Sequence, residues 1–187
     1  MASPIETSRA LTLLRYRTIF FRMKFILCLL ALLSLGPRAM AASEFSPMTK
    51  HVHFTLQLNA PPAAAFPLFD PVNETKWDPD WKPQLLGDRV EEGLVFLVGD
   101  GRDRTTWLLD RYEPNAFRIA YVVAARSTLT RINIALEPRA GGSTATVTYT
   151  KTALDSEGVT IVDHFIEHFP SERRHWESAI NAVLDRT

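Results

Sequence analysis

The sequence contains almost no cysteine: Cys28 is the single thiol among 187 residues. We expect the segment around Cys28 to be removed, for reasons given below, which would leave the mature protein without a thiol. Thiolate catalysis, cysteine–zinc sites and disulfide bonds are then excluded. The chain also lacks a G-x-S-x-G nucleophile motif, a glycine-rich phosphate loop and a dinucleotide-binding fingerprint, so none of these enzyme signatures is present.

Net charge is absent as well, since 21 Lys and Arg residues balance 21 Asp and Glu residues. The distribution is uneven, because six of the basic residues and one of the acidic residues lie within residues 1–41. The rest of the chain has 15 basic and 20 acidic residues, a net charge of −5. Such a mildly acidic body offers no basic surface for nucleic acid, and we expect no nucleic-acid partner.

One long apolar run occurs, near the N-terminus. Met23-Lys24 precedes the apolar residues 25–35, and Ala39-Met40-Ala41 then has the small-x-small form of a signal-peptidase site. These three features predict a secretory signal peptide over residues 1–41, with translation starting at Met23 as an alternative. The run is shorter than the about 20 apolar residues that span a bilayer. An uncleaved anchor helix is the alternative interpretation.

The signal peptide predicts an exported protein, periplasmic or secreted, with no stable membrane span after cleavage. A linker is expected over residues 42–49 and a single domain over residues 50–187. Hydrophobic residues make up 46% of the sequence, which is ample for the packed core of one domain. The oligomeric state is left open by the sequence.

Alternating apolar and polar residues predict β-strands over much of this domain. In residues 50–58, Val52, Phe54, Leu56 and Leu58 share one face, which is the pattern of a half-buried strand. Similar runs follow at residues 94–98, 105–112, 117–124, 127–136 and 144–153. Short turns join them, and these predict an antiparallel meander, because parallel pairing would need long crossovers.

Helices are predicted at three places. Residues 60–69 and 72–77 favour two short helices, and the proline-rich residues 78–83 favour a loop. Near the C-terminus, Asp155 can cap a long amphipathic helix, which we expect to bend at Pro170 and to lie across the concave side of the sheet. The order of these elements indicates an α+β fold.

Several segments resemble bacterial SRPBCC proteins, a superfamily that includes START-like lipid carriers, the birch-pollen allergen and polyketide cyclases. They are Phe66–Pro71 with Trp77-x-Pro79-x-Trp81-x-Pro83, then Thr105–Pro114, Ile119–Val122 and Val147–Leu154. The resemblance covers roughly residues 50–187. It implies a helix-grip fold, in which a curved antiparallel β-sheet is wrapped around a long C-terminal α-helix, two short helices follow the first strand, and an apolar cavity lies between sheet and helix.

The candidate ligand-binding residues are aromatic, and each could instead be simple core. They fall on faces expected to point inward or on the proline-rich loop: Trp77, Trp81, Phe96, Trp107, Tyr121, Tyr149, Phe165 and Phe169. An apolar site with a few polar groups is typical of small-molecule binding. Tyr121 and Tyr149 could supply hydroxyl groups. Arg111 or Arg131 could pair with an anionic head group, although strand parity favours a solvated surface position for Arg131. An interior in which Trp107 and Phe165 interlock without a void would contradict this interpretation.

Carboxylates and histidines offer weaker candidates. Asp70, Glu74, Asp78 and Asp80 gather near the expected cavity mouth, where a desolvated carboxyl could serve as an acid or base; helix capping is the alternative. The segment His164–His168 fits the H-x-x-E-H pattern of some zinc peptidases, but its helical position predicts that both imidazoles face water. His51 and His53 are expected on the outer face of the first strand. We expect no metal and no cofactor.

Three hypotheses on function follow. The first is an exported protein that holds a hydrophobic or amphipathic ligand, such as a lipid, a quinone or a polycyclic aromatic, between sheet and terminal helix. The second is an enzyme of the cyclase, dehydratase or hydrolase type that uses the same cavity, with Tyr121, Tyr149 or a loop aspartate transferring protons. The third is an interaction module of the cell envelope. The first is favoured, since inward-facing polar groups are few.

Overall fold

The computed structural model describes residues 45–186, so the predicted signal peptide lies outside the described residues. The strands are β1 (Thr49–Leu58), β2 (Gln84–Leu85), β3 (Val95–Val98), β4 (Thr105–Glu113), β5 (Arg118–Ala124), β6 (Thr128–Arg139) and β7 (Gly142–Ala153). The α-helices are α2 (Pro62–Ala65) and α3 (Ser156–Leu184). Short 3₁₀ helices are η1 (Phe66–Phe69), η2 (Asn73–Lys76), η3 (Gly101–Asp103) and η4 (Pro114–Ala116).

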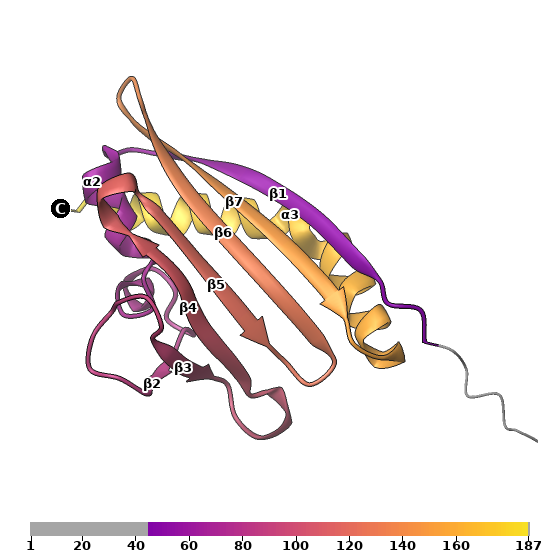
Figure 1. Ribbon diagram of the computed structural model, residues 1–187. Coiled ribbons are helices and arrows are strands. Elements are labelled where there is room, and N and C mark those ends of the chain that lie inside the picture. Colours follow the sequence, from indigo (N-terminus) through magenta and orange to yellow (C-terminus); the bar gives the residue numbers. More distant parts are fainter. Residues whose placement is uncertain (1–44, 187) are drawn as a thin grey trace, which may run out of the picture. The chain divides into compact units, whose positions relative to one another are not determined.

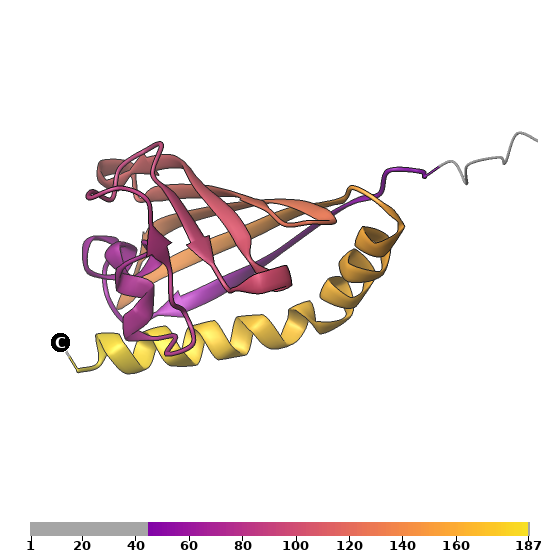
Figure 2. The same cartoon turned by 90° about the horizontal axis from the view of Figure 1, so that it is seen from below.

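The seven strands form one antiparallel sheet in the order β1-β7-β6-β5-β4-β3-β2 (Figure 1). The strands from β2 to β7 follow one another as a meander, and β1 returns to pair with β7. The sheet curves around α3, which crosses its concave side (Figure 2). This architecture confirms the predicted α+β helix-grip fold.

The predicted inward face is confirmed in β1 and β7. Phe54, Leu56 and Leu58 are buried, whereas the residues between them are exposed. In β7, Ala145 and Val147 are fully buried on the same face of the sheet. The period-two pattern therefore identified which side of the sheet carries the core.

Some boundaries differ from the predictions for local reasons. Phe117 adopts a left-handed conformation (φ 53°) that closes the turn after η4, so β5 begins at Arg118. The predicted helix over residues 60–69 is a short α-helix that continues as the 3₁₀ helix η1. The two-residue strand β2 was not predicted, because a segment this short carries no detectable alternation.

The terminal helix α3 contains Pro170 and continues through it without interruption. The helix is bent along its length (Figure 2). Proline lacks an N–H group and clashes with the preceding turn, which explains the bend. Buried residues on both sides of Pro170, among them Val162 and Ile180, hold the two halves against the sheet. Asp155 caps the helix as predicted: its Oδ1 accepts a hydrogen bond from the Gly158 backbone N–H at 2.8 Å. Within residues 45–186, no helix combines the length and apolarity needed to cross a membrane.

Candidate functional site

A cavity of about 190 Å³ lies between the sheet, η2 and the C-terminal half of α3. Its apolar lining consists of Phe69, Trp81, Trp107, Ile132, Ile134 and Trp176. Its polar lining consists of Glu74, Asp78, Tyr121, Tyr149 and Glu172. An aromatic pocket with a few polar groups is the usual form of a small-molecule site.

Sheet register aligns the floor of this cavity. Tyr121 on β5 is opposite Ile132 on β6, and Ile132 is in turn opposite Tyr149 on β7. Residues that are opposite one another in adjacent strands point to the same side of the sheet. Alternation within each strand therefore directs all three side chains toward α3.

The other wall comes from the segment between α2 and β2, which is fixed by hydrogen bonds. The buried Asp70 carboxylate accepts hydrogen bonds from the backbone N–H groups of Val72 and Asn73 and from the Asn73 side chain, at 2.6 to 2.9 Å. This turn sets the direction of η2, on which Glu74 lies. The proline-rich loop that follows is secured by Trp81, whose Nε1–H donates to the Pro71 carbonyl at 2.8 Å.

Two aromatic clusters flank the cavity. In the first, Trp107 meets Trp81 at 83° with ring centroids 5.1 Å apart and Tyr121 at 73° and 5.7 Å. In the second, Tyr149 packs against Phe169 at 5.6 Å. The rings of Trp81 and Tyr121 therefore meet Trp107 edge to face and do not form a flat stack with it.

Glu74 carries the most perturbed carboxyl group of the site. The residue is partly buried, and within residues 45–186 no side chain forms an ion pair or hydrogen bond with its carboxylate. Burial raises the pKa of Glu74 well above its ordinary value, and the negative charges of Asp78 and then Asp70 raise it further. Glu74 therefore keeps its proton to a higher pH than an exposed glutamate.

The two tyrosines of the cavity floor are affected by the same charges. Burial raises the pKa of Tyr121 well above its usual range, and Glu74 and Asp70 add to this effect. Burial likewise raises the pKa of Tyr149, with smaller contributions from Glu74 and Glu172. Both hydroxyl groups therefore remain neutral at physiological pH. The Tyr121 hydroxyl is engaged, since it donates to the Phe69 carbonyl at 2.7 Å.

Four of the eight predicted aromatic residues line the cavity: Trp81, Trp107, Tyr121 and Tyr149. The other four pack behind it. Phe96 is fully buried and stacks on Trp107, and Trp77 donates from Nε1 to the Leu68 carbonyl and packs on Trp176. Phe165 and Phe169 pack on Tyr149. Within residues 45–186, Trp107 and Phe165 share no ring contact, and a cavity is present. The interior is therefore not the interlocked one that would have contradicted a binding site.

The predicted polar candidates are similarly divided. Glu74 and Asp78 line the cavity, whereas Asp70 anchors a turn and Asp80 is exposed. Arg111 does not line the cavity; it is exposed and lies 3.9 Å from Glu113. The structure thus gives Arg111 no role toward a ligand here. Its side chain is on the far side of the sheet, where β4 changes register between Leu109 and Arg111.

Five lining residues were not among the candidates from the sequence: Phe69, Ile132, Ile134, Glu172 and Trp176. Trp176 and Glu172 lie on α3 after Pro170, and Ile132 lies on β6. Trp176 follows Phe169 by seven residues, a helical spacing that could have placed it on the same face. Lys151 was also overlooked, although strict alternation in β7 puts it on the inner face. Its Nζ lies 4.9 Å from the centre of the Phe165 ring, and burial lowers its pKa.

A larger hollow of about 710 Å³ occurs between β1 and α3 at the bend. Most of its lining is exposed, including His53, Arg173 and Arg174. Glu177 also lines this hollow, and its carboxylate accepts a hydrogen bond from the backbone N–H of Gln57 at 2.8 Å. This hollow is an open groove with few buried polar groups, so the smaller aromatic cavity is the better candidate site.

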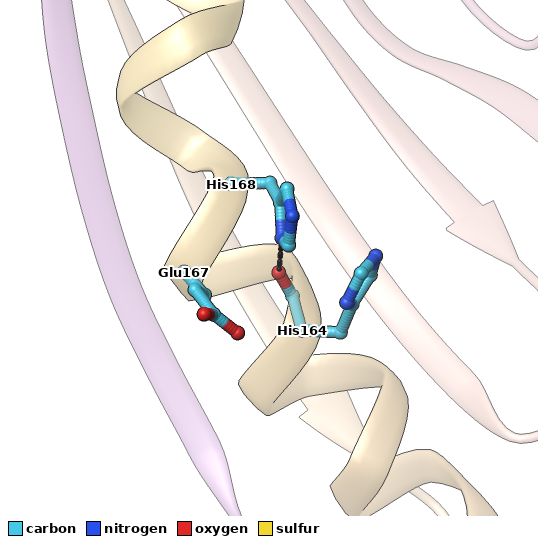
Figure 3. Close-up of side chains that lie close together, drawn as sticks. All are labelled: His164, Glu167 and His168. Carbon is cyan, nitrogen blue, oxygen red and sulfur yellow. Dashed lines mark hydrogen bonds between the residues drawn. The ribbon is translucent and has the colours of Figure 1, made fainter.

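His164, Glu167 and His168 gather on the surface of α3 (Figure 3). All three are exposed, as the helical positions of the two histidines predicted. One ligand atom from each lies within 4.8 Å of the others, so they could hold a transition-metal ion. His168 Nδ1 lies 2.9 Å from the His164 carbonyl oxygen, and both rings project from one side of the helix. No described cavity includes these residues, so the geometry does not support a zinc peptidase site.

Neither a protein-family model nor a curated protein matches the sequence. Solved structures do match. An uncharacterised protein from Rhizobium leguminosarum superposes with a TM-score of 0.58 and 19% identity, over 76% of this chain and 98% of that one. Norcoclaurine synthase from Thalictrum flavum, in complex with dopamine and hydroxybenzaldehyde, superposes with a TM-score of 0.58 and 15% identity. The match covers 75% of this chain and 89% of the synthase chain. Ara h 8.0201 superposes with a TM-score of 0.57 and 16% identity, over 76% of this chain and 100% of the other.

Identities this low concern the fold and leave the chemistry of each site open. The likeness nevertheless extends over 98%, 89% and 100% of these three matched structures. The chain therefore has the same fold as these solved structures, a helix-grip fold in which a curved antiparallel sheet surrounds a long terminal helix.

Proposed function

We propose that the chain is an exported small-molecule-binding protein whose ligand is a small amphipathic molecule held in the aromatic cavity. The observation that carries this proposal is the cavity itself, in which three tryptophans and two tyrosines surround an unfilled volume of about 190 Å³. Core packing normally leaves few voids larger than a water molecule. An unfilled volume lined by large side chains with polar groups among them is better explained by a ligand than by packing alone.

The volume limits the ligand. A cavity of about 150 Å³ accommodates one benzene molecule, so this cavity fits about one ring with a short substituent. A quinone head group is compatible with that size. A whole lipid or a polycyclic aromatic would need additional space, either from widening of the cavity or from the groove beside α3. Norcoclaurine synthase, which shares the fold, was solved with two one-ring compounds.

Indole is a suitable neutral probe, and isothermal titration calorimetry can measure its binding. Ile132→Phe adds volume inside the cavity, and we expect it to weaken indole binding at least about tenfold. Leu129→Phe is the matched control, because Leu129 lies on the exposed face of the same strand. Equal affinities in all three proteins, or no binding to the wild type, would contradict the proposal.

Acid–base catalysis in the same cavity, of the cyclase or dehydratase type, is the second candidate. It is favoured by Glu74, whose raised pKa suits a proton donor near neutral pH. The neutral hydroxyl of Tyr149 could orient a substrate carbonyl. This candidate predicts a bell-shaped pH profile, and it predicts that Glu74→Gln loses turnover while the protein is at least as stable as the wild type. Unchanged turnover in Glu74→Gln would exclude Glu74 as the donor.

A further inference from the structure

The charged groups of the cavity are all of one sign. Glu74, Asp78 and Glu172 belong to its lining, and none of the lining residues in the described part of the chain is Lys, Arg or His. Within residues 45–186, none of the three ion pairs includes one of these carboxylates. One of the pairs, Arg173–Glu177, lies close to Glu172 on α3. Among the described residues, no cationic side chain is therefore paired with a carboxylate of the cavity.

The remaining lining favours the same kind of ligand. Trp81, Trp107 and Tyr121 line the cavity, and Trp107 meets the other two rings edge to face at centroid distances of 5.1 and 5.7 Å. The π faces of aromatic rings attract cations, most strongly when the cation is desolvated, as in a closed pocket. Carboxylates and aromatic faces together therefore select positive charge.

An organic cation fits this lining better than a metal ion does. A hard metal ion needs several oxygen ligands that converge on one point. Among the described residues, the one group of three ligating side chains close enough to share an ion is His164, Glu167 and His168, on the outer surface of α3. Glu74, Asp78 and Glu172 are thus spread around the cavity, as suits a cation whose charge is distributed over methyl or ammonium groups.

We infer that the cavity selects a small organic cation, a protonated or quaternary amine of about one ring in size, whose charge lies among Glu74, Asp78 and Glu172 and whose apolar part contacts Trp81 and Trp107. This inference rests on the proposed binding function and adds the ligand class to it. Trp176, on α3, belongs to the apolar lining as well.

Binding of a cation is coupled to proton release. A positive charge beside Glu74 favours its ionised form, so the ligand lowers the pKa of Glu74 and displaces its proton to solvent. The titratable groups that face Glu74 are Asp70 and Asp78 on its own segment, Tyr121 on β5, Tyr149 on β7 and Glu172 on α3. Both tyrosines stay neutral, so affinity for a permanently charged cation rises with pH as Glu74 ionises.

Phenyltrimethylammonium and its neutral isostere tert-butylbenzene test the inference, because they differ in charge and hardly in shape. Affinity is measured by fluorescence titration of the purified full chain, and proton release by calorimetry in two buffers of different ionisation enthalpy. At pH 8 we expect the cation to bind at least about tenfold more tightly than the isostere, with uptake of protons by the buffer. The preference is expected to decrease as the pH is lowered.

Glu74→Gln keeps the side-chain volume and removes the titrating charge. We expect this variant to lose at least about fivefold of the cation's preference and to show no proton release. Glu137→Gln is the matched control, because Glu137 is exposed on β6 outside the cavity, and it should behave as the wild type.

The results with these compounds test the ligand class and the binding function separately. If tert-butylbenzene binds as tightly as the cation, the inference of a cationic ligand is overturned and the binding function stands. If neither compound binds and indole also fails to bind, both are overturned. An unchanged preference in Glu74→Gln would likewise overturn the assigned role of Glu74.

Discussion

Glu74 shows how the tertiary structure changes the chemistry of a single residue. In the sequence it is one of four acidic residues in a loop-rich segment, with nothing to distinguish it. In the fold it lies beside Asp78 and Asp70 in a partly buried position, and within residues 45–186 it has no cationic partner. Natural sites often retain such unfavourable groups because function requires them.

The raised pKa of Glu74 makes a prediction about stability. In the unfolded chain its pKa is near the ordinary value of 4.5, and in the folded protein it is well above that. Below pH 4.5 both states are protonated and Glu74 has no effect; as the pH rises above it, the unfolded state ionises first and the free energy of unfolding falls. Glu74→Gln removes this loss, so we expect the variant to be more stable than the wild type at pH 8.

Urea unfolding at pH values from 4 to 8 measures this effect. The two proteins should have the same midpoint near pH 4 and separate as the pH rises. Glu137→Gln, which alters an exposed glutamate on β6, should follow the wild type throughout. A Glu74→Gln variant that is less stable at pH 8 would show that the carboxylate is stabilised in the folded state.

At the scale of elements, the position of α3 decides the site, because Glu172 and Trp176 reach the cavity from its C-terminal half. The first turn of this helix is docked closely on the sheet at Gly158. A Cβ atom at that position would collide with the Ser127 carbonyl oxygen and would lie 3.1 Å from the Cα atom of Ala153. Gly158 is thus required by the close approach of two backbones.

Gly158→Ala is therefore expected to destabilise the protein, although alanine favours helix by about 1 kcal/mol over glycine. The collision is with backbone atoms, which cannot rotate away, and overpacking of this kind costs about 1–3 kcal/mol. We expect a net decrease in the free energy of unfolding, measured by urea denaturation. Ser178→Ala, at an exposed position of the same helix, should change stability by less than about 0.5 kcal/mol. An equally stable Gly158→Ala protein would mean that the helix can move off the sheet.

At the scale of the whole molecule, every strand and helix that builds the cavity lies between Thr49 and Leu184. β1 pairs with β7 along ten residues, so the N-terminal strand is an integral part of the sheet. The predicted cleavage after Ala41 would leave all of these elements intact. Export and ligand binding are thus compatible within one chain.

Residues 42–187 are therefore expected to fold alone, with one cooperative thermal transition and the same indole affinity as the full chain. Circular dichroism and calorimetry measure these properties. N-terminal sequencing of the protein recovered from an exporting host tests the leader, and the expected first residue is Ala42. A broad, non-cooperative transition would show that residues 1–41 contribute to the fold, and an intact leader would favour the anchor helix.

The order of elements and the inner face of each strand were determined by the sequence, because side-chain alternation is local and records which face is buried. Three of the aromatic residues that line the cavity, Trp107, Tyr121 and Tyr149, were identified in this way, whereas Trp81 lies on the proline-rich loop. Which aromatic residues leave a void, and which carboxylates border it, depended on tertiary structure. The cavity is lined by Glu74 on η2 and by Glu172 and Trp176 on α3, from segments about a hundred residues apart. No local pattern encodes such a meeting, because it results from the bend of one helix against the curvature of one sheet.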